Sequence, residues 1–222
     1  MVNAGVKESK ESILVLCAHS DDQILGCGGT IAKYAKEGKA VSIVIFSYGE
    51  MSHPWLKPYY IASLRKAESE MASTVIGAKD TLFLGLSEGN FKQEFDEKNM
   101  KERLKEIFKK YKPTKIYTHA VDDPLPDHSA VFSVVDQFCE ETKYAGDLYS
   151  FEVWNPVNIS KRDVPKVVVD ISDTFKTKLK ALKCFRSQRL AMLSLKWSIY
   201  WKAISNGRKN KVKYGELFYK MR

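Results

Sequence analysis

The chain has 222 residues, a length typical of one compact domain. Hydrophobic residues make up 44% and charged residues 28%, which excludes a disordered tail, a collagen-like repeat and a small disulfide-stapled scaffold. No apolar run approaches the ~20 residues of a membrane span, and the polar N-terminus lacks the apolar centre of a signal peptide. The cysteines are scattered without a Cys-x-x-Cys pair. We therefore expect one cytoplasmic domain over residues 1–222, with reduced thiols.

The net charge of +9 is placed unevenly. Residues 176–222 carry 14 lysines and arginines against one acid, Glu216, for a net +13, whereas residues 1–175 carry 22 against 26, for a net −4. Such a basic segment can meet an acidic substrate, a phosphate-rich surface or nucleic acid. Because neither zinc-finger spacing nor an aromatic RNA-binding signature accompanies it, we favour a solvated basic face and expect no nucleic-acid partner.

Short apolar runs alternate with helical stretches along the chain. Taken in order, the sequence predicts a strand at 13–18, a helix at 30–36, a strand at 41–47, a helix at 61–75, a strand at 81–84, a helix at 100–111, a strand at 115–119, a helix at 128–138, strands at 148–154 and 167–171, and a long basic helix at 172–190. Continuous apolar strands separated by helices are typical of parallel sheets buried on both faces. The fold predicted is α/β, a Rossmann-like open and mostly parallel sheet flanked by helices with right-handed crossovers.

Polar side chains collect where two predicted strands end. Those that follow the first and the fourth strand are His19, Asp21, Asp22, His119, Asp127 and His128. In open α/β sheets, functional groups lie beyond the C-terminal ends of the strands. Two imidazoles and one carboxylate, with one coordination position left open, are a ligand set for a catalytic divalent ion. The alternative is an Asp-Asp helix N-cap beside an unremarkable histidine.

Several sequence blocks in a fixed order point to a known family. The blocks are 18–23 (Ala-His-Ser-Asp-Asp-Gln) with glycines at 26 and 28–29, then Arg65, Glu68, Ala72 and 76–77, then 84–89 (Leu-Gly-Leu-Ser-Glu-Gly), 118–119 (Thr-His), 125–131 (Leu-Pro-Asp-His-Ser-Ala-Val), 170–172, 187–188 and 215–218. In this order they resemble the LmbE/PIG-L-like zinc-dependent N-deacetylases, which remove acetyl from N-acetylglucosaminyl groups. The resemblance covers about residues 13–218.

The resemblance implies a metal-dependent hydrolase with a Rossmann-like fold and no dinucleotide. It implies that zinc, or iron(II) in its place, is held by His19, Asp22 and His128. It implies Asp21 as the general base, with Asp127 orienting a histidine or assisting that base. The substrate implied is a small glycoconjugate with an N-acetylglucosamine group, and the basic C-terminal segment suggests that it is anionic. Some relatives complete their sites across a subunit interface, so a homo-oligomer is a further expectation.

The resemblance also implies substrate contacts, from Arg65 and Glu88, and His53 is a candidate for the pocket mouth. Three positions depart from the family pattern. Serine replaces proline at position 20, glutamine replaces glutamate at 23, and Leu125 replaces the first histidine of His-Pro-Asp-His. Leucine cannot donate a hydrogen bond, so the acid or oxyanion-stabilising role of that histidine is vacant or passes to His119 or His53.

Two other readings of the same residues stay open. Gly26-x-Gly28-Gly29 after a strand is also found in nucleotide-binding domains, but seven residues separate it from the strand, so we interpret these glycines as close helix–sheet packing. The departures at Gln23 and Leu125 would also fit a non-catalytic relative that kept the fold and the metal.

Overall fold

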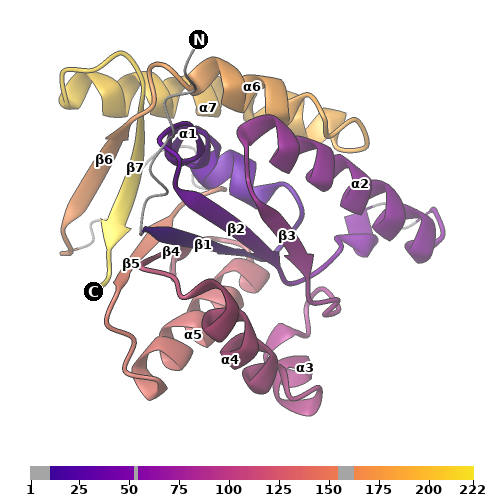
Figure 1. Cartoon of the computed structure of the whole chain (residues 1–222). Helices are drawn as coiled ribbons and strands as arrows, with labels where there is room; N and C mark the ends of the chain where they lie inside the picture. Colours follow the sequence, from indigo (N-terminus) through magenta and orange to yellow (C-terminus); the bar gives the residue numbers. More distant parts are fainter. Residues whose placement is uncertain (1–10, 53–54, 155–162) are drawn as a thin grey trace, which may run out of the picture.

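The computed structural model describes residues 11–52, 55–154 and 163–222. Its strands form one seven-stranded sheet in the order β3-β2-β1-β4-β5-β7-β6 (Figure 1). The strands are β1 (Ser12–Cys17), β2 (Ala40–Ile45), β3 (Asp80–Phe83), β4 (Lys115–His119), β5 (Asp147–Phe151), β6 (Lys166–Asp170) and β7 (Gly215–Lys220). The pairs among β1 to β5 are parallel, and β7 is antiparallel to both of its neighbours. The predicted α/β fold with a mostly parallel sheet is confirmed.

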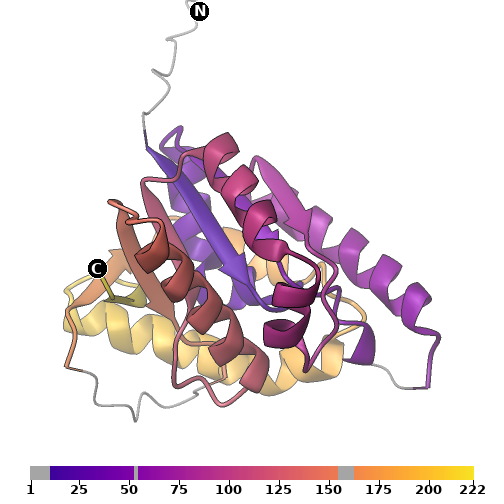
Figure 2. The same cartoon turned by 90° about the horizontal axis from the view of Figure 1, so that it is seen from below.

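Helices cover both faces of the sheet, as Figures 1 and 2 show. One face carries α1 (Asp22–Lys36), α2 (Pro58–Ile76), α6 (Phe175–Leu182) and α7 (Arg189–Lys209), and the other carries α3 (Phe91–Glu97), α4 (Met100–Tyr111) and α5 (Pro126–Glu141). A short 3-10 turn, η1 (Glu50–Ser52), precedes α2. None of these helices is both long and apolar enough to cross a bilayer.

The central strands explain why the sequence shows continuous apolar runs. In β1, Ile13 and Val15 join one hydrophobic core, while Leu14 and Leu16 join the core on the opposite face. All four side chains are fully buried. A strand with helices on both faces needs apolar side chains at every position, which removes the alternation seen in half-exposed strands.

The first helix starts earlier than the sequence predicts, at Asp22, and the glycines lie inside it. The helix is kinked at Cys27, whose φ of −139° and ψ of 20° are not helical. A Cβ added at Gly26 would lie 2.2 Å from the Phe151 ring, and one at Gly29 would lie 2.8 Å from the Ile171 side chain. The glycines therefore allow close packing of the helix on its neighbours, as the sequence interpretation held.

The predicted helix over 172–190 is wrong, because the chain leaves the helix after α6 and starts α7 at Arg189. Between them, Phe185 is buried and Ser187 donates from its N–H and its hydroxyl to the Glu68 carboxylate of α2, at 2.8 and 2.6 Å. These long-range contacts offset the local preference for helix. The predicted strand 148–154 likewise ends at Phe151, because the N–H of Val153 donates instead to the Asp123 side chain at 3.1 Å. The sequence analysis also missed α3 and β7.

Candidate metal centre

The candidate site lies where the order of the parallel strands reverses. β1 and β4 are neighbours at the centre of the sheet, and the chain leaves their C-terminal ends in opposite directions. His19 follows β1, Asp22 is the first residue of α1, and His128 lies in the first turn of α5. Such a switch point leaves a crevice between the two outgoing connections.

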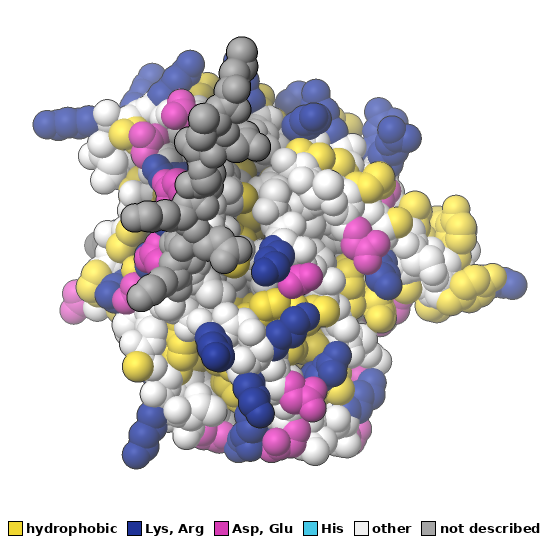
Figure 3. Space-filling model, viewed as in Figure 1, with side chains coloured by type: hydrophobic (Ala, Val, Ile, Leu, Met, Phe, Trp, Pro, Cys, Tyr) yellow, Lys and Arg dark blue, Asp and Glu magenta, His cyan; other side chains and the backbone are white. Residues whose placement is uncertain are grey.

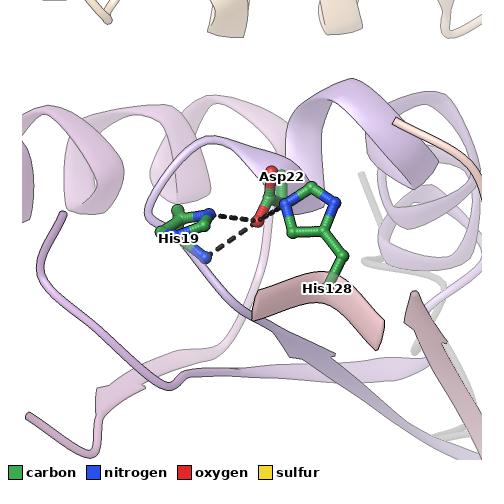
Figure 4. A group of neighbouring side chains, drawn as sticks. All are labelled: His19, Asp22 and His128. Atoms are coloured by element: carbon green, nitrogen blue, oxygen red, sulfur yellow. Dashed lines mark hydrogen bonds and ion pairs between the residues drawn. The ribbon is translucent and has the colours of Figure 1, made fainter. Parts of the chain in front are cut away.

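Figure 4 shows the rings of His19 and His128 on either side of the Asp22 carboxylate. Asp22 Oδ2 lies 3.4 Å from His19 Nδ1 and 3.3 Å from His128 Nε2, and the three residues offer ligand atoms within 4.8 Å of one another. A tetrahedral zinc with ligands at about 2.0–2.1 Å places its donor atoms about 3.3 Å apart. Within the described residues, His128 Nε2 has no hydrogen bond, although it is buried. The three side chains therefore fit a divalent ion in both donor chemistry and spacing.

Further buried side chains contact Asp22 and His128 on the side away from the cavity. Asp123 Oδ1 lies 2.9 Å from His128 Nδ1, and the same carboxylate accepts from the backbone N–H of Leu125 and of Val153. His119 Nε2 accepts the N–H of Ala18 at 2.9 Å and lies 3.3 Å from Asp22 Oδ2. The His119 and His128 rings stack with centroids 3.8 Å apart. His119, Asp123 and His128 also satisfy the spacing of a metal group, but all three are buried.

The charges in the group depend on one another. Burial lowers the pKa of His19, but hydrogen bonds with Asp127 and Asp22 outweigh it and raise this pKa to about 10. Burial also opposes the charged form of His128, yet the attraction of Asp22 and its contact with Asp123 raise its pKa to about 9. Burial and the neighbouring charge of His128 lower the pKa of His119 to about 4. The site thus holds His119 neutral, which agrees with its role as acceptor of a backbone N–H.

A cavity of about 160 Å³ opens in front of the group. Its lining consists of His19, Asp21, Asp22, Arg65, Glu88, Leu125, Trp154, Gln188, Met192 and Leu195. Five of the residues singled out from the sequence as ligand, base or substrate contact are in this lining. His119 and the predicted ligand His128 are not, because both are completely buried. His53 lies outside the described residues.

Asp21 is held at the edge of the cavity by Arg65. Arg65 Nη2 lies 3.3 Å from Asp21 Oδ1, while its Nε donates to Ser20 Oγ and its Nη1 donates to the carbonyl of Gly49, both at 3.0 Å. A Cβ at Gly49, where φ is +76°, would lie 2.1 Å from the guanidinium, so glycine is needed for this approach. Burial raises the pKa of Asp21 and the positive charge of Arg65 opposes that rise.

Asp127 links His19 to the loop after β3. Its Oδ2 lies 3.2 Å from His19 Nε2, and its Oδ1 accepts the N–H of Gly89 at 2.9 Å. This contact leaves Nδ1 of the His19 ring facing Asp22. The neighbouring Glu88 has its pKa raised by burial, and its Oε1 has no hydrogen-bond partner in the described part of the chain.

Sequence reasoning missed two groups of site residues. Asp123 is not among the residues singled out from the sequence, although its position shortly after the strand-ending His119 was a usable signal. Trp154, Met192 and Leu195 reach the cavity from the late part of the chain. Nothing in their local sequence marks them, because the packing of α7 brings Met192 and Leu195 to the site and Trp154 comes from the connection after β5.

Comparison with known proteins identifies the family and agrees with the fold. The family profile described as "PIG-L: GlcNAc-PI de-N-acetylase" matches residues 14–139. The chain is 29% identical over 196 residues to a probable N-acetyl-alpha-D-glucosaminyl L-malate deacetylase 2 of Bacillus cereus, covering 82% of this chain and 85% of the relative. It is 25% identical over 198 residues to a 4-oxalmesaconate hydratase of Pseudomonas putida, covering 81% of this chain and 74% of the relative.

Two solved structures share the fold. The 4-carboxy-2-hydroxymuconate hydratase of Pseudomonas putida matches with a TM-score of 0.82 at 22% identity, covering 96% of both chains. The N,N'-diacetylchitobiose deacetylase of Pyrococcus horikoshii matches with a TM-score of 0.80 at 22% identity, covering 100% of this chain and 87% of the other. One architecture therefore serves both deacetylases and a hydratase among the proteins similar to this chain.

Proposed function

This chain belongs to the PIG-L family, and we propose that it is a metal-dependent hydrolase that removes the N-acetyl group from a small molecule containing N-acetylglucosamine. The observation that carries the proposal is the convergence of His19, Asp22 and His128, of which His19 and Asp22 line a cavity together with Asp21. A ligand group with an adjacent, independently held base is the arrangement that hydrolysis of an amide requires.

His19, Asp22 and His128 are the residues proposed to hold the ion, zinc or iron(II). An ion bound there supplies Lewis acidity, which lowers the pKa of a water toward about 7 and polarises a carbonyl oxygen. Asp127 and Asp123 position the two imidazoles through Nε2 of His19 and Nδ1 of His128. Such contacts orient ligating histidines and raise their basicity.

Asp21 is the proposed general base. Its carboxylate lines the cavity, and Arg65 favours the anionic form against the effect of burial. Asp21 accepts a proton from the attacking water as the water oxygen bonds to the acetyl carbon. The same carboxyl then returns the proton to the sugar nitrogen as the C–N bond breaks, which yields acetate and a free amine.

Other proposed roles follow from position. Arg65 and Glu88 line the cavity and are proposed as contacts for the sugar hydroxyls. His119 is proposed as a positioning residue, because its ring contacts Asp22 and His128 while its Nε2 already accepts the N–H of Ala18. Leu125 occupies the cavity wall without a hydrogen-bond donor, so this chain lacks a second acid at that point.

Metal analysis and an acetate assay on matched variants test the proposal. We expect the wild type and Asp21→Asn to retain about one zinc per chain, and His19→Ala and His128→Ala to lose it. Asp21→Asn should lower acetate release from N-acetylglucosamine compounds by about 10²–10⁴-fold, since it removes the base but not the ligands. Equal metal content in all four proteins would contradict the ligands, and absence of acetate release by the zinc-loaded wild type from a broad panel would contradict the reaction.

A hydratase is the second candidate, because the similarity to the 4-oxalmesaconate hydratase covers 81% of this chain. Leu125 does not discriminate between the two reactions, since water addition to a double bond also needs a proton, for the carbon next to the new C–O bond. An assay of water addition to 4-oxalmesaconate with the same variants decides between the two reactions. Turnover of that compound without acetate release from any amide would favour the hydratase.

A further inference from the structure

Helix α7 exposes large apolar side chains on its outer face and carries polar side chains on its inner one. A surface helix normally turns an apolar stripe toward the core and polar residues toward water. In α7 the residues at the spacing i, i+3, i+7 and i+11 that face solvent are Leu190, Leu193, Trp197 and Trp201, and they are 58–85% exposed. The inward side of α7 packs Leu195, Ile199 and Ala203 against the core, and it also carries Ser198 and Lys202. Polar side chains among buried apolar ones need partners that the rest of the fold must supply.

These inward residues line a second cavity, of about 270 Å³, bounded by α7, β7, the end of β5 and the first turn of α1. It is distinct from the cavity of the candidate metal centre, although Leu195 contributes to the walls of both. Its charged lining residues are Glu152, Lys178, Lys202, Lys209 and Glu216. The space-filling view of Figure 3 shows lysines and arginines scattered over the face drawn, so positive charge alone does not distinguish this position.

Two of these charges already satisfy each other. Lys178 Nζ donates to Glu216 Oε1 at 2.7 Å and to the carbonyl of Leu25 at 2.8 Å. Glu216 also accepts from the N–H of Gly29 and from the N–H and hydroxyl of Thr30, at 2.6–3.0 Å. This buried pair therefore contributes no net charge to the cavity.

Lys202 is different. Its side chain is half-buried, and within the described residues no hydrogen bond or ion pair joins its ammonium. Burial lowers its pKa to about 8; the charges of Glu152 and Asp123 act against this fall and the charge of Lys178 adds to it. The ammonium thus stays largely protonated at pH 7 without a direct partner, an arrangement that costs free energy unless an anion or water satisfies it.

Two polar side chains next to Lys202 also lack a hydrogen-bond partner within the described residues. The hydroxyl of Ser198 is one helical turn before Lys202 and is 3% exposed, and the side-chain amide of Asn206 is one turn after it. Neither side chain makes a hydrogen bond within the described part of the chain. Both groups line the cavity, so a cation and two hydrogen-bond donors point to the same enclosed volume.

We propose that this cavity is a binding site for a small anion, held through a carboxylate or phosphate group by Lys202, Ser198 and Asn206. Lys202 supplies the charge, and the hydroxyl and the amide donate hydrogen bonds to the remaining oxygens. The site is separate from the residues assigned to hydrolysis, so it does not depend on the proposed function.

Titration of the full-length protein with inorganic phosphate, malate and citrate at pH 7 tests the site. Trp201 lines the cavity, so its fluorescence should report binding, with calorimetry as the independent measurement. We expect saturable binding of at least one probe. Lys202→Met should weaken it by about 10-fold or more, the usual effect of removing a hydrogen bond to a charged group. The control Lys196→Met removes the same charge from an exposed position of α7 outside the cavity and should change the affinity less than twofold.

Ser198→Ala provides a second test that leaves every charge in place, in case Lys202→Met does not fold. It should weaken binding by several-fold, because one donor is lost. Absence of saturable binding by all three probes overturns the proposal. An equal loss of affinity in Lys202→Met and Lys196→Met overturns it too, because it would indicate diffuse attraction to the protein surface.

Kinetics on a phosphate-bearing and a neutral N-acetylglucosamine compound distinguish two sources of the anion. If the anion is part of the substrate, Lys202→Met raises KM for the phosphate-bearing compound alone. If it is a free molecule, KM is unchanged for both compounds while probe binding is still lost.

Discussion

Replacing Glu216 with alanine should destabilise the protein strongly, although this residue lies outside the metal centre. The carboxylate is 5% exposed, pairs with Lys178 at 2.7 Å and accepts the N–H groups of Gly29 and Thr30. These N–H groups follow the kink at Cys27, where the helical hydrogen bonding of α1 is interrupted. Glu216 therefore acts as a remote cap for the second part of α1.

Removing one partner of a buried ion pair typically costs about 3–5 kcal/mol, because the other charge stays buried without a partner. At roughly 2–4 °C per kcal/mol for a chain of this size, Glu216→Ala should lower Tm by roughly 6–20 °C in thermal unfolding followed by circular dichroism. The double variant Lys178→Met/Glu216→Ala should recover about 1–3 kcal/mol, since no ammonium is then left unpaired.

The matched control is Asp147→Asn, which removes a carboxylate 2.7 Å from the exposed Lys220 on the same sheet. An exposed pair of this kind contributes about 0–1 kcal/mol. If Glu216→Ala lowered Tm no more than Asp147→Asn does, or if the double variant were less stable than Glu216→Ala, the account of Glu216 as a buried cap would be refuted.

Three further predictions concern the cavity wall, the helix packing and the thiols. Leu125→His should raise the rate of acetate release by at least 10-fold, since one added donor is worth up to about 10²–10³ in kcat; an unchanged rate at equal metal content would count against a missing donor. Gly26→Ala should cost about 1–3 kcal/mol in urea unfolding because the new methyl group meets the Phe151 ring, and Phe151→Leu in the same chain should restore part of the loss. Iodoacetamide should label the native protein at Cys184 and leave the fully buried Cys27 unmodified. Because burial raises the pKa of both thiols, labelling of Cys184 should accelerate as the pH rises above 7. Rapid labelling of Cys27 would contradict this prediction, because it would show that the core around Cys27 opens.

The residues of the candidate metal centre could be proposed from the sequence because they lie at strand ends. His19 and Asp22 follow one buried strand, and His128 starts the helix after another. This local arrangement, together with the block pattern of the family, was sufficient to name a ligand set. It did not show that the His119 ring is buried behind Asp22, because the direction of a strand-end side chain depends on how the next helix packs.

The class of structure follows from the amino-acid pattern alone: apolar runs without alternation require strands covered on both faces, and their alternation with helices requires parallel crossovers. The course of the C-terminal part, in contrast, depends on long-range packing. The break between α6 and α7 depends on contacts from Ser187 to Glu68, far apart in sequence, and the polar side chains that α7 turns toward the second cavity are recognised only when its neighbours are known. A helix or strand with a strong apolar pattern can be predicted from its own residues. A segment that is stabilised by residues far away in sequence can be predicted only when the positions of those residues are known.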